Sequence, residues 1–364
     1  MTNLFDTRRE FTLPGGVYNA TPPRIVFGAG SLAKVSDAVE VYGAKRAVVV
    51  ATPGRSGLAQ RVADLLGDRS CGIIPEAVSQ VPIELAQRGR KLAADMGADC
   101  IVSVGGGASI GLGKGIGLEY AKPIIAIPTT YAGSEMTGFC GITIDGVKRM
   151  HTSLNMLAST VIYDPELSLS LPTDISMASA MNALAHCVDV VYVPTVSPLI
   201  LAAAHEGAAV LMDAMPRVAT DPSDLAARTD LLYGAYLAGA ALTGGFAYQH
   251  GVAHTLGGSF GIAHGLSHAL VLPHVAAYNK RHAPRELARL AQAMGVAELG
   301  PALFDLLKKT GLPTSLAEVG FQEGDIARAA DITVETDNGL NPGPITREDV
   351  VALLEDAYHG RRPA

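Results

Sequence analysis

Histidines and one asparagine are spaced so that they could form a chemical site. The chain of 364 residues contains ten histidines, among them His250, His254 and His264. Asn182 and His186 are four residues apart, as are His250 and His254, which places each pair on one face of a helix. A neutral imidazole is a frequent ligand of divalent iron or zinc, so three that converge from two helices could hold one ion. A single histidine is more often an ordinary core or surface residue, and only the spaced set favours a site.

A glycine-rich segment could bind phosphate. The run Gly105-Gly106-Gly107-Ala108-Ser109 follows an apolar segment with the character of a strand and opens a predicted helix. Because glycine has no side chain, backbone N–H groups and the helix N-terminus can approach an anion closely. The run is not the GxGxxG fingerprint of the usual dinucleotide folds. By itself it predicts either a phosphate-binding loop or a tight turn between strand and helix.

A second loop, rich in hydroxyl groups, follows the next predicted strand. Thr129, Thr130, Ser134 and Thr137 lie in the run PTTYAGSEMT, and their hydroxyl groups could bind phosphate or ribose oxygens. Lys148, beyond the following turn, could add a positive charge. Two such loops at the carboxyl ends of adjacent strands are what a nucleotide crevice needs. We therefore predict that these residues bind a nucleotide cofactor.

The choice between NADH and NADPH stays open. Thr52 ends a predicted strand where the adenosine ribose is expected, and Arg55 follows it without an acidic residue nearby. An acidic residue would bind the ribose hydroxyls, whereas an arginine could accept a 2′-phosphate. Both cofactors are compatible with this segment, in which Thr52 is a candidate contact.

The elements that must position these residues are of two kinds. The first half of the chain alternates short apolar runs with segments of helical spacing. Continuous apolar runs are typical of strands buried on both faces, so we predict a parallel sheet covered by helices. The predicted strands are 46–52, 71–74, 100–104 and 123–128, and the predicted helices are 58–66, 83–96 and 110–120. Ile142–Ile144 and Val161–Tyr163 are predicted as further strands in an antiparallel addition.

Beyond Asp164 the character of the sequence changes. Apolar residues recur at helical spacing, almost without strand-like runs, and Thr173 is a predicted N-cap of the first helix. The predicted helices are 177–193, 199–215, 225–242, 267–280, 301–309 and 347–358. We therefore predict an α/β nucleotide-binding domain over residues 1–168 and an all-helical domain over residues 169–364.

Composition and charge exclude several classes of protein. Lys and Arg number 28 against 35 Asp and Glu, and this net charge of −7 argues against nucleic-acid binding on a basic face. No segment offers the ~18 uninterrupted apolar residues of a membrane span, and no secretory signal is visible. Four scattered cysteines without a CxxC pair predict no disulfide framework and no zinc ribbon. We expect a cytoplasmic protein that acts on small molecules.

Five motifs follow one another along the chain: GGGAS, PTTYAGSEMT, YDP, NALAH, and HGVAH followed by His264. In that order the chain resembles the iron-containing (group III) alcohol dehydrogenases, which share a dehydroquinate synthase-like fold. The resemblance implies an N-terminal domain that binds NAD(P)H, a helical C-terminal domain, an active site in the cleft between them, and a homodimer in which 19–27 could pair with a second copy. The motifs are GGGAS at 105–109, PTTYAGSEMT at 128–137, YDP at 163–165, NALAH at 182–186, and HGVAH at 250–254 followed by His264.

The resemblance also implies roles for the spaced residues. The positions that match the family's metal ligands are Asn182, His186, His250 and His264, and His254 matches a histidine beside the nicotinamide. The family has an aspartate where this chain has Asn182. A neutral amide is a weaker ligand than a carboxylate, so the substitution weakens the iron or zinc site. It also removes a negative charge that would repel an anionic substrate.

The resemblance, together with the uncharged Asn182, implies an NAD(P)H-dependent reductase that acts on a small dicarboxylate. Hydride transfer to an alkene conjugated with a ketone develops negative charge on the ketone oxygen, and polar donors stabilise that charge. His254, His250, His186 and Tyr131 are the predicted donors and proton sources. The alternatives are an iron- or zinc-dependent alcohol or aldehyde dehydrogenase and a non-catalytic nucleotide-binding protein with the same fold.

Overall fold

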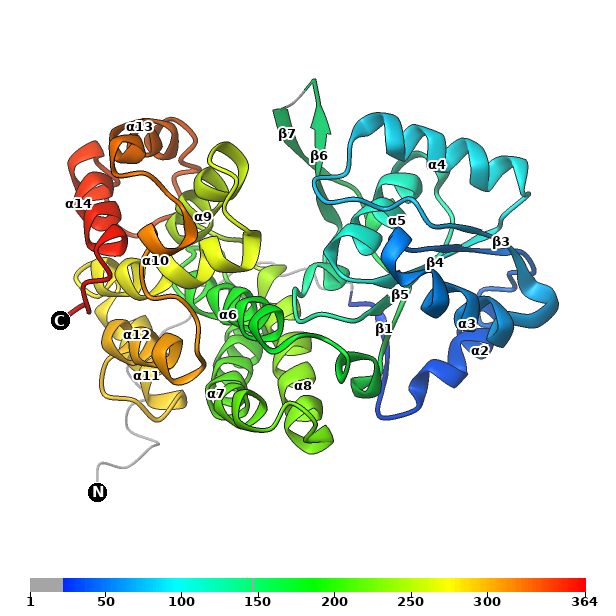
Figure 1. Ribbon diagram of the computed structural model, residues 1–364, viewed down its shortest axis with the longest axis horizontal. Coiled ribbons are helices and arrows are strands. Elements are labelled where there is room, and N and C mark those ends of the chain that lie inside the picture. The colour runs from blue at the N-terminus through cyan, green and yellow to red at the C-terminus, as the bar shows by residue number, and fades with distance from the viewer. Residues whose placement is uncertain (1–21, 146) are drawn as a thin grey trace.

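The computed structural model describes residues 22–145 and 147–364 of the chain. Figure 1 shows two domains side by side, an α/β domain and a domain built of helices. The last strand ends at Tyr163, and the first helix of the helical domain begins at Thr173. The domain boundary predicted at residue 168 falls within this connection and stays a prediction.

A six-stranded parallel sheet forms the centre of the α/β domain. Its strands lie in the order β1-β8-β5-β4-β2-β3, and each neighbouring pair is parallel. The prediction of an antiparallel addition is wrong for Val161–Tyr163, because β8 lies in parallel between β5 and β1. A short apolar run fits either direction, and only the path of the chain determines which one forms. The strands are β1 (Arg24–Phe27), β2 (Ala47–Val50), β3 (Ser70–Ile74), β4 (Cys100–Gly105), β5 (Ile124–Pro128) and β8 (Thr160–Tyr163).

Helices cover both faces of this sheet because side chains alternate along each strand. Val48 and Val50 belong to the apolar core that includes Leu85 of α4 and Leu112 of α5. Val49 points to the opposite face, into the core formed with α2 and α3. These helices are α2 (Val35–Glu40), α3 (Ser56–Leu66), α4 (Ile83–Asp95) and α5 (Gly107–Tyr120). The predicted sheet wrapped by helices is therefore confirmed.

A separate hairpin extends beside the main sheet. It consists of β6 (Phe139–Ile144) and β7 (Val147–Thr152), which pair in an antiparallel register. β6 contacts α4 and α5, and in Figure 1 the hairpin projects at the top of the molecule between the two domains. The strand predicted at Ile142–Ile144 is confirmed as part of β6.

The remainder of the described chain is helical, as predicted. α6 lies between α7, α8 and α10, which explains why it is buried almost all round. The prediction that Thr173 is an N-cap is wrong, because Thr173 is the first residue of α6 and Pro172 occupies the cap position. The helices are α6 (Thr173–Val190), α7 (Pro198–Thr220), α8 (Leu225–Leu242), α9 (Tyr248–Ser259), α10 (His264–Asn279), α11 (Pro284–Ala293), α12 (Leu299–Lys309), α13 (Ile326–Glu335) and α14 (Arg347–Tyr358).

One helix in the described part of the chain, α7, is long and apolar enough to cross a membrane by length and composition. Core helices of soluble proteins meet the same criterion. α7 packs against α6 and α8 within the helical domain, and it contains Glu206, Asp213 and Arg217. Its length is therefore weak evidence for a membrane span.

The two domains approach each other closely where Gly133 meets Gly239. Gly133, in the loop after β5, has a φ of 77°, a left-handed conformation that favours glycine. A Cβ atom on Gly133 would lie 2.9 Å from Cα of Gly239 in α8, and one on Gly239 would lie 2.7 Å from the Gly133 carbonyl oxygen. A side chain at either position would push the loop away from α8. The contact therefore fixes the loop after β5 against the helical domain.

Candidate active site

A cleft of about 740 Å³ lies between the two domains. This volume falls within the usual range for ligand pockets. Its walls come from α5 and the loop after β5 on one side and from α6, α9 and α10 on the other. Among the residues that line it are Gly107, Lys114, Thr130, Ser134, Asn182, His186, His250, His254 and His264. The structure therefore brings the glycine-rich loop and the spaced histidines to one cavity.

The glycine-rich loop joins β4 to α5 through close backbone packing. Gly105 has a φ of 138°, and a Cβ atom there would lie 2.5 Å from Oγ of Ser109. A Cβ atom on Gly106 would lie 3.0 Å from Cγ2 of Thr130, so this loop packs directly on the loop after β5. Gly107 begins α5 and faces the cleft with open space beside it. The N-terminus of α5 is therefore accessible to an anionic group.

The predicted cofactor contacts divide into those that line the cleft and those behind it. Gly107, Thr130 and Ser134 line it. The Thr129 N–H donates to the Gly105 carbonyl oxygen, and the Ser109 Oγ is buried without a hydrogen-bond partner. The residues that are not part of the cleft lining are Thr52, Gly105, Gly106, Ser109, Thr129 and Thr137. The side chain of Lys148 lies outside the described part of the chain, and all these cofactor roles stay predictions.

Lys114 is a buried cation in the cleft wall that sequence reasoning missed. Its Nζ donates to the Ser134 carbonyl oxygen, to Oγ1 of Thr137 at 2.9 Å and to the Phe139 carbonyl oxygen at 3.0 Å. Burial lowers the pKa of Lys114 to about 8. One side chain of α5 therefore holds the whole segment from Ser134 to Phe139 in place.

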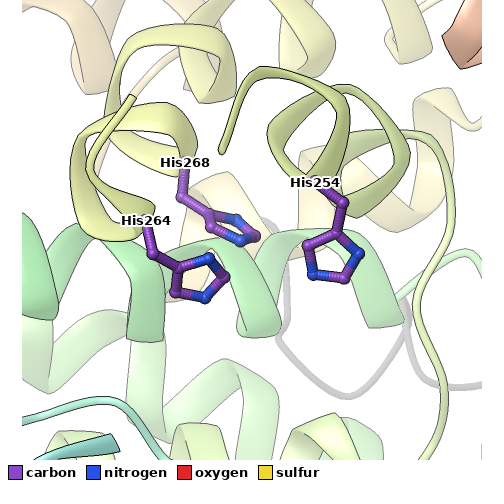
Figure 2. A group of neighbouring side chains, drawn as sticks. All are labelled: His254, His264 and His268. Atoms are coloured by element: carbon purple, nitrogen blue, oxygen red, sulfur yellow. The ribbon is translucent and has the colours of Figure 1, made fainter. Parts of the chain in front are cut away.

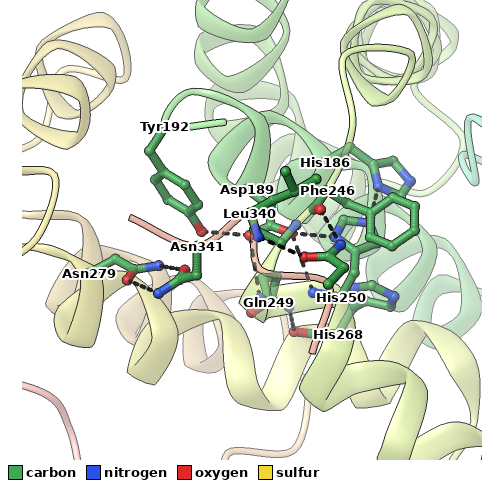
Figure 3. Close-up of polar contacts among 12 residues, drawn as sticks. His186, Asp189, Tyr192, Phe246, Gln249, His250, His268, Asn279, Leu340 and Asn341 are labelled. Atoms are coloured by element: carbon green, nitrogen blue, oxygen red, sulfur yellow. Dashed lines mark hydrogen bonds and ion pairs between the residues drawn. The ribbon is translucent and has the colours of Figure 1, made fainter. Parts of the chain in front are cut away.

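A buried carboxylate orients the two central histidines (Figure 3). Asp189 Oδ2 accepts a bond of 2.7 Å from Nδ1 of His250 and a bond of 2.6 Å from the Ala247 N–H. Asp189 Oδ1 accepts from the Tyr192 hydroxyl at 2.6 Å. Nε2 of His250 lies 2.8 Å from Nδ1 of His186, and the two rings are stacked. Asp189 was not among the residues predicted from the sequence.

The same chain of contacts determines where protons lie. Nε2 of His186 lies 3.0 Å from the Ala132 carbonyl oxygen, which can only accept, so Nε2 carries a proton. The chain from Ala132 to Asp189 thus needs three protons, one more than two neutral imidazoles carry. Burial, followed by the neighbouring His250, lowers the pKa of His186 well below its usual value.

Asn182 presents an unsatisfied oxygen beside these rings. Its Nδ2 donates to the Ala132 carbonyl oxygen at 3.4 Å, and its Oδ1 is buried without a hydrogen-bond partner. Asn182 is 2% exposed and lines the cleft. A buried amide oxygen without a partner costs free energy, so this atom is available to a donor group on a ligand.

The three remaining histidines of the site lie on α9 and α10 (Figure 2). His254 is half-buried, His264 is exposed at the first position of α10, and His268 is buried one turn further on. Their ligand atoms all lie within 4.8 Å of one another. Burial, with neighbouring histidines as the next cause, lowers the pKa of His268 well below its usual value. His268 was not predicted as a site residue, although it follows His264 at helical spacing.

The four residues that match the family's metal ligands do not form one converging group as their side chains stand, although the facing nitrogens of His186 and His250 and the unpartnered Asn182 Oδ1 are of the right kind for an ion. The ring nitrogens of His186 and His250 all have partners, namely each other, the Ala132 carbonyl oxygen and Asp189. An ion between Nδ1 of His186 and Nε2 of His250 would replace only the contact between these two atoms and would leave the bonds to Ala132 and Asp189 in place. The ligand atoms of His254, His264 and His268 do converge. Within residues 22–145 and 147–364, they are the one such group of three among histidines, cysteines and acidic residues. Of the predicted ligands, that group contains only His264.

Tyr131 does not line the cleft in this structure, and its catalytic role stays a prediction that the structure does not favour. It is fully buried and absent from the cleft lining. Its hydroxyl accepts a bond of 3.1 Å from Nη1 of Arg228, a buried residue of α8. The motif that contains Tyr131 borders the cleft through Thr130 and Ala132, and the intervening side chain points into the interior. Sequence proximity alone did not reveal this direction.

Comparisons with known proteins identify the class. A family model described as "Iron-containing alcohol dehydrogenase" matches residues 22–165, and the model "Fe-containing alcohol dehydrogenase family, C-terminal" matches residues 176–358. The chain therefore belongs to the iron-containing alcohol dehydrogenase family, and the predicted fold is confirmed. Its similarity is to the maleylacetate reductases within that family. One relative, the maleylacetate reductase of Burkholderia cepacia, is 44% identical over 96% of this chain and 99% of its own length.

Solved structures agree with this assignment. The maleylacetate reductase from Agrobacterium tumefaciens has a TM-score of 0.93 at 40% identity, covering 96% of this chain and 100% of that chain. A putative alcohol dehydrogenase from Ralstonia eutropha JMP134 has a TM-score of 0.94 at 46% identity, with the same coverage. The family predicted from the ordered motifs is thus confirmed across almost the whole chain.

Proposed function

We propose that the protein reduces maleylacetate to 3-oxoadipate with NADH or NADPH, in the catabolism of aromatic compounds. The proposal is supported by maleylacetate reductases at 39–44% identity over nearly the full length. The structural observation that carries it is the composition of the cleft, in which the glycine-rich loop, Asn182 and the histidines share one cavity. This arrangement would bring a reduced nicotinamide next to a substrate that carries two carboxylates.

The reaction is a conjugate reduction. Hydride leaves the nicotinamide and bonds to the alkene carbon that lies β to the ketone, and NAD(P)H becomes NAD(P)⁺. The π electrons move to form an enolate on the ketone oxygen, and a proton then adds to the α carbon to give the saturated ketone. Charge on the ketone oxygen develops only as hydride arrives, so polar donors placed at that oxygen accelerate the reaction.

The charges of the cleft suit an anionic substrate. Asn182 is uncharged where the family has an acid, and the buried Asp189 carboxylate lies 2.7 Å from Nδ1 of His250, behind the rings. Lys114 contributes a cation to the cleft wall. We assign the roles of donor and proton source to His186, His250 and His254, without Tyr131. No step of this reaction is assigned to a metal.

The cofactor and the assembly are parts of the same proposal. Arg55 is half-buried near the end of β2 and would favour the 2′-phosphate of NADPH, while Thr52 is compatible with either cofactor. We further propose a cytoplasmic homodimer that involves no membrane and no nucleic acid. β1 lies at an edge of the sheet, where a second copy could add its own strand. Light scattering on the purified protein tests the dimer.

Initial rates of NADH and NADPH oxidation with maleylacetate test the activity. We expect turnover with at least one cofactor, and chelator-treated protein should retain it. The control substrate is a primary alcohol with NAD⁺ or NADP⁺, which tests the alternative of a metal-dependent alcohol dehydrogenase. Absence of maleylacetate reduction with both cofactors would refute the proposed function.

A further inference from the structure

Two phenylalanine rings from opposite domains meet in the cleft. Phe139 is the first residue of β6 in the α/β domain, and Phe246 lies shortly before α9 in the helical domain. Both line the cleft, and their ring centroids are 6.2 Å apart at an interplanar angle of 56°. No other phenylalanine, tyrosine or tryptophan belongs to the cleft wall in the described part of the chain. Phe139 and Phe246 therefore form one aromatic wall that reaches from one domain to the other.

The ring of Phe246 lies directly beside the histidines of the site (Figure 3). Its centroid is 5.0 Å from that of His250 at an angle of 33°, and 5.8 Å from that of His254 at an angle of 74°. The Phe246 side chain is half-buried and lines the cleft, so part of its ring is accessible to a ligand. A ligand that lies on this ring is therefore next to two of the histidines to which we assign the roles of donor and proton source.

The backbone around Phe246 is fixed at three consecutive residues. Gly245 has a φ of 109°, a conformation that favours glycine. The Phe246 carbonyl oxygen accepts a bond of 2.8 Å from Nδ2 of Asn338, and the Ala247 N–H donates to Asp189 Oδ2 at 2.6 Å. The ring is therefore held in place before any ligand binds, which lowers the entropy that binding costs.

Phe139 is fixed from the other domain. Its carbonyl oxygen accepts a bond of 3.0 Å from Nζ of the buried Lys114, and it pairs with Thr152 in the hairpin of β6 and β7. The Lys114 Nζ also donates to Oγ1 of Thr137, two residues before Phe139. Each half of the aromatic wall is thus anchored to its own domain, and the two halves meet only when the domains are in this orientation.

We propose that the aromatic wall of Phe139 and Phe246 makes the site specific for a planar, conjugated substrate. This inference rests on the proposed function and deepens it. The alkene and the ketone of maleylacetate are conjugated and lie in one plane, whereas hydride transfer makes the two former alkene carbons tetrahedral. Aromatic rings favour contact with a flat π system, by roughly 2- to 10-fold in affinity. The wall therefore holds the substrate more tightly than the product and favours release of the product.

The wall lies on the side of the cleft where the substrate is expected. The glycine-rich loop, Thr130 and Ser134 belong to the α/β domain, so the cofactor enters the cleft from that side. Phe246 belongs to the helical domain together with His250 and His254. A substrate between the nicotinamide and these histidines lies against Phe246, and Phe139 closes the wall at the edge of the hairpin.

The binding of two six-carbon dicarboxylates to the full-length protein tests this specificity without turnover. trans,trans-Muconate is planar and conjugated, whereas adipate carries the same two charges on a saturated chain. By calorimetry, the wild type should bind muconate at least roughly 10-fold more tightly than adipate. Phe246→Leu and Phe139→Leu should each lower the affinity for muconate roughly 3- to 10-fold and leave that for adipate within about twofold. The matched control is Phe260→Leu, which removes a half-buried ring that packs on Phe321 outside the cleft wall and should change neither affinity.

Three results would overturn the proposal. The first is a wild type that binds muconate no more tightly than adipate. The second is an equal loss of both affinities in Phe246→Leu, which would indicate a general defect of the cleft. The third is a weaker affinity for NADH in this variant with an unchanged preference for muconate, which would assign the wall to the nicotinamide.

The two phenylalanine variants also keep the test independent of folding and of the reaction. Circular dichroism establishes whether Phe246→Leu folds, and if it does not, Phe139→Leu on the other domain decides. Maleylacetate turnover without a preference for muconate would overturn the aromatic wall and leave the reductase proposal intact. A preference for muconate that both variants lose, in a protein without turnover, would refute only the reaction.

Discussion

Among the residues described in the cleft wall, Lys114 is the one lysine or arginine. Its position is set by α5, which carries it one turn and a half beyond the glycine-rich loop, and by three oxygen acceptors on the segment from Ser134 to Phe139. A buried ammonium group is stable only when its hydrogen bonds are satisfied. Lys114 therefore depends on this segment as much as the segment depends on Lys114.

Replacing Lys114 by Met should impair cofactor binding more than chemistry. The variant leaves three buried oxygens without a donor, so the segment that carries Ser134 loosens and KM for NADH should rise roughly 10-fold. In the wild type, KM should also rise as pH passes about 8, because the side chain then loses its charge, while the variant should show no such step. The exposed Lys122→Met is the control, and an equal change there would contradict the assignment.

Asp189 acts on the site only through His250, so we regard it as a positioning residue. In Asp189→Asn, the side-chain amide cannot accept all the bonds now made by Ala247, Tyr192 and His250, and His250 loses its orienting carboxylate. We expect kcat for maleylacetate to fall roughly 10- to 100-fold while KM for NADH stays unchanged. Tyr192→Phe is the control, because it removes one bond and keeps the charge. Parallel losses in kcat and cofactor KM would indicate a general structural defect instead.

The sequence identified site residues that belong to a spaced set, and it did not identify isolated ones. Asn182, His186, His250 and His264 all line the cleft, as expected from the spacing of the two helical pairs together with the family resemblance. Lys114 belongs to no motif that the sequence analysis recognised. Asp189 shows one signal that could have been read, a single carboxylate within the apolar run that follows His186. Buried charges need partners, so such a residue indicates a polar network.

At the scale of elements, the periodicity of the sequence predicted the positions of helices and strands. It was less successful in predicting how the strands pair. The strand at Val161–Tyr163 was found, but its parallel place between β5 and β1 depends on contacts far away in the sequence. α9 carries His250 and His254 and was not among the bounded helices, because the segment is rich in glycine and polar residues. Its helical form is determined by packing against α6 and α10, which sequence periodicity does not register.

α10 contains one titratable group whose burial gives a testable acid sensitivity. His274 is 6% exposed, its Nε2 has no hydrogen-bond partner, and burial lowers its pKa to about 4. The unfolded chain binds a proton near pH 6.5, whereas the folded chain does so only near pH 4. Stability is therefore lost as pH falls through this window, by up to about 3 kcal/mol.

His274→Leu should abolish this contribution. The free energy of unfolding of the wild type should fall by about 2–3 kcal/mol more than that of the variant between pH 7 and 4.5. Urea denaturation at a series of pH values measures the difference. The control is His359→Gln at the surface, which should leave the pH dependence of the free energy of unfolding as in the wild type. Identical profiles for wild type and His274→Leu would mean that this ring takes up a proton equally well in the folded and the unfolded chain.

At the scale of the whole molecule, the net charge of −7 and the character of the cleft differ. Acidic residues lie at the surface, for example Asp305, which pairs with Arg362, while Asn182 and the histidines face the cavity. Overall charge therefore says little about which ligand the cleft accepts. At this scale, the site depends on a fixed orientation of the two domains, because each domain supplies only part of it.

Arg228 is the side chain that joins the domains most directly. It is fully buried in α8, and its guanidinium donates to the Tyr131 hydroxyl at 3.1 Å, to Ser176 Oγ at 2.7 Å and to the Leu171 carbonyl oxygen at 3.2 Å. Tyr131 belongs to the α/β domain, whereas Leu171 and Ser176 lie where the helical domain begins. Ala132, next to Tyr131, carries the carbonyl oxygen that His186 and Asn182 contact. A shift of Tyr131 relative to Arg228 would therefore displace the Ala132 carbonyl oxygen in the active site.

Arg228→Met should lower the free energy of unfolding by about 3–4 kcal/mol, because it leaves buried hydroxyl and carbonyl groups without donors. The companion variant Tyr131→Phe removes only the contact with Arg228 and should cost about 1 kcal/mol. If Tyr131 is structural, as its burial indicates, Tyr131→Phe should keep kcat within about threefold, whereas loss of a proton donor would lower it at least roughly 100-fold. Denaturant titration and steady-state rates on the same two variants therefore separate the structural role of this joint from the catalytic role first predicted for Tyr131.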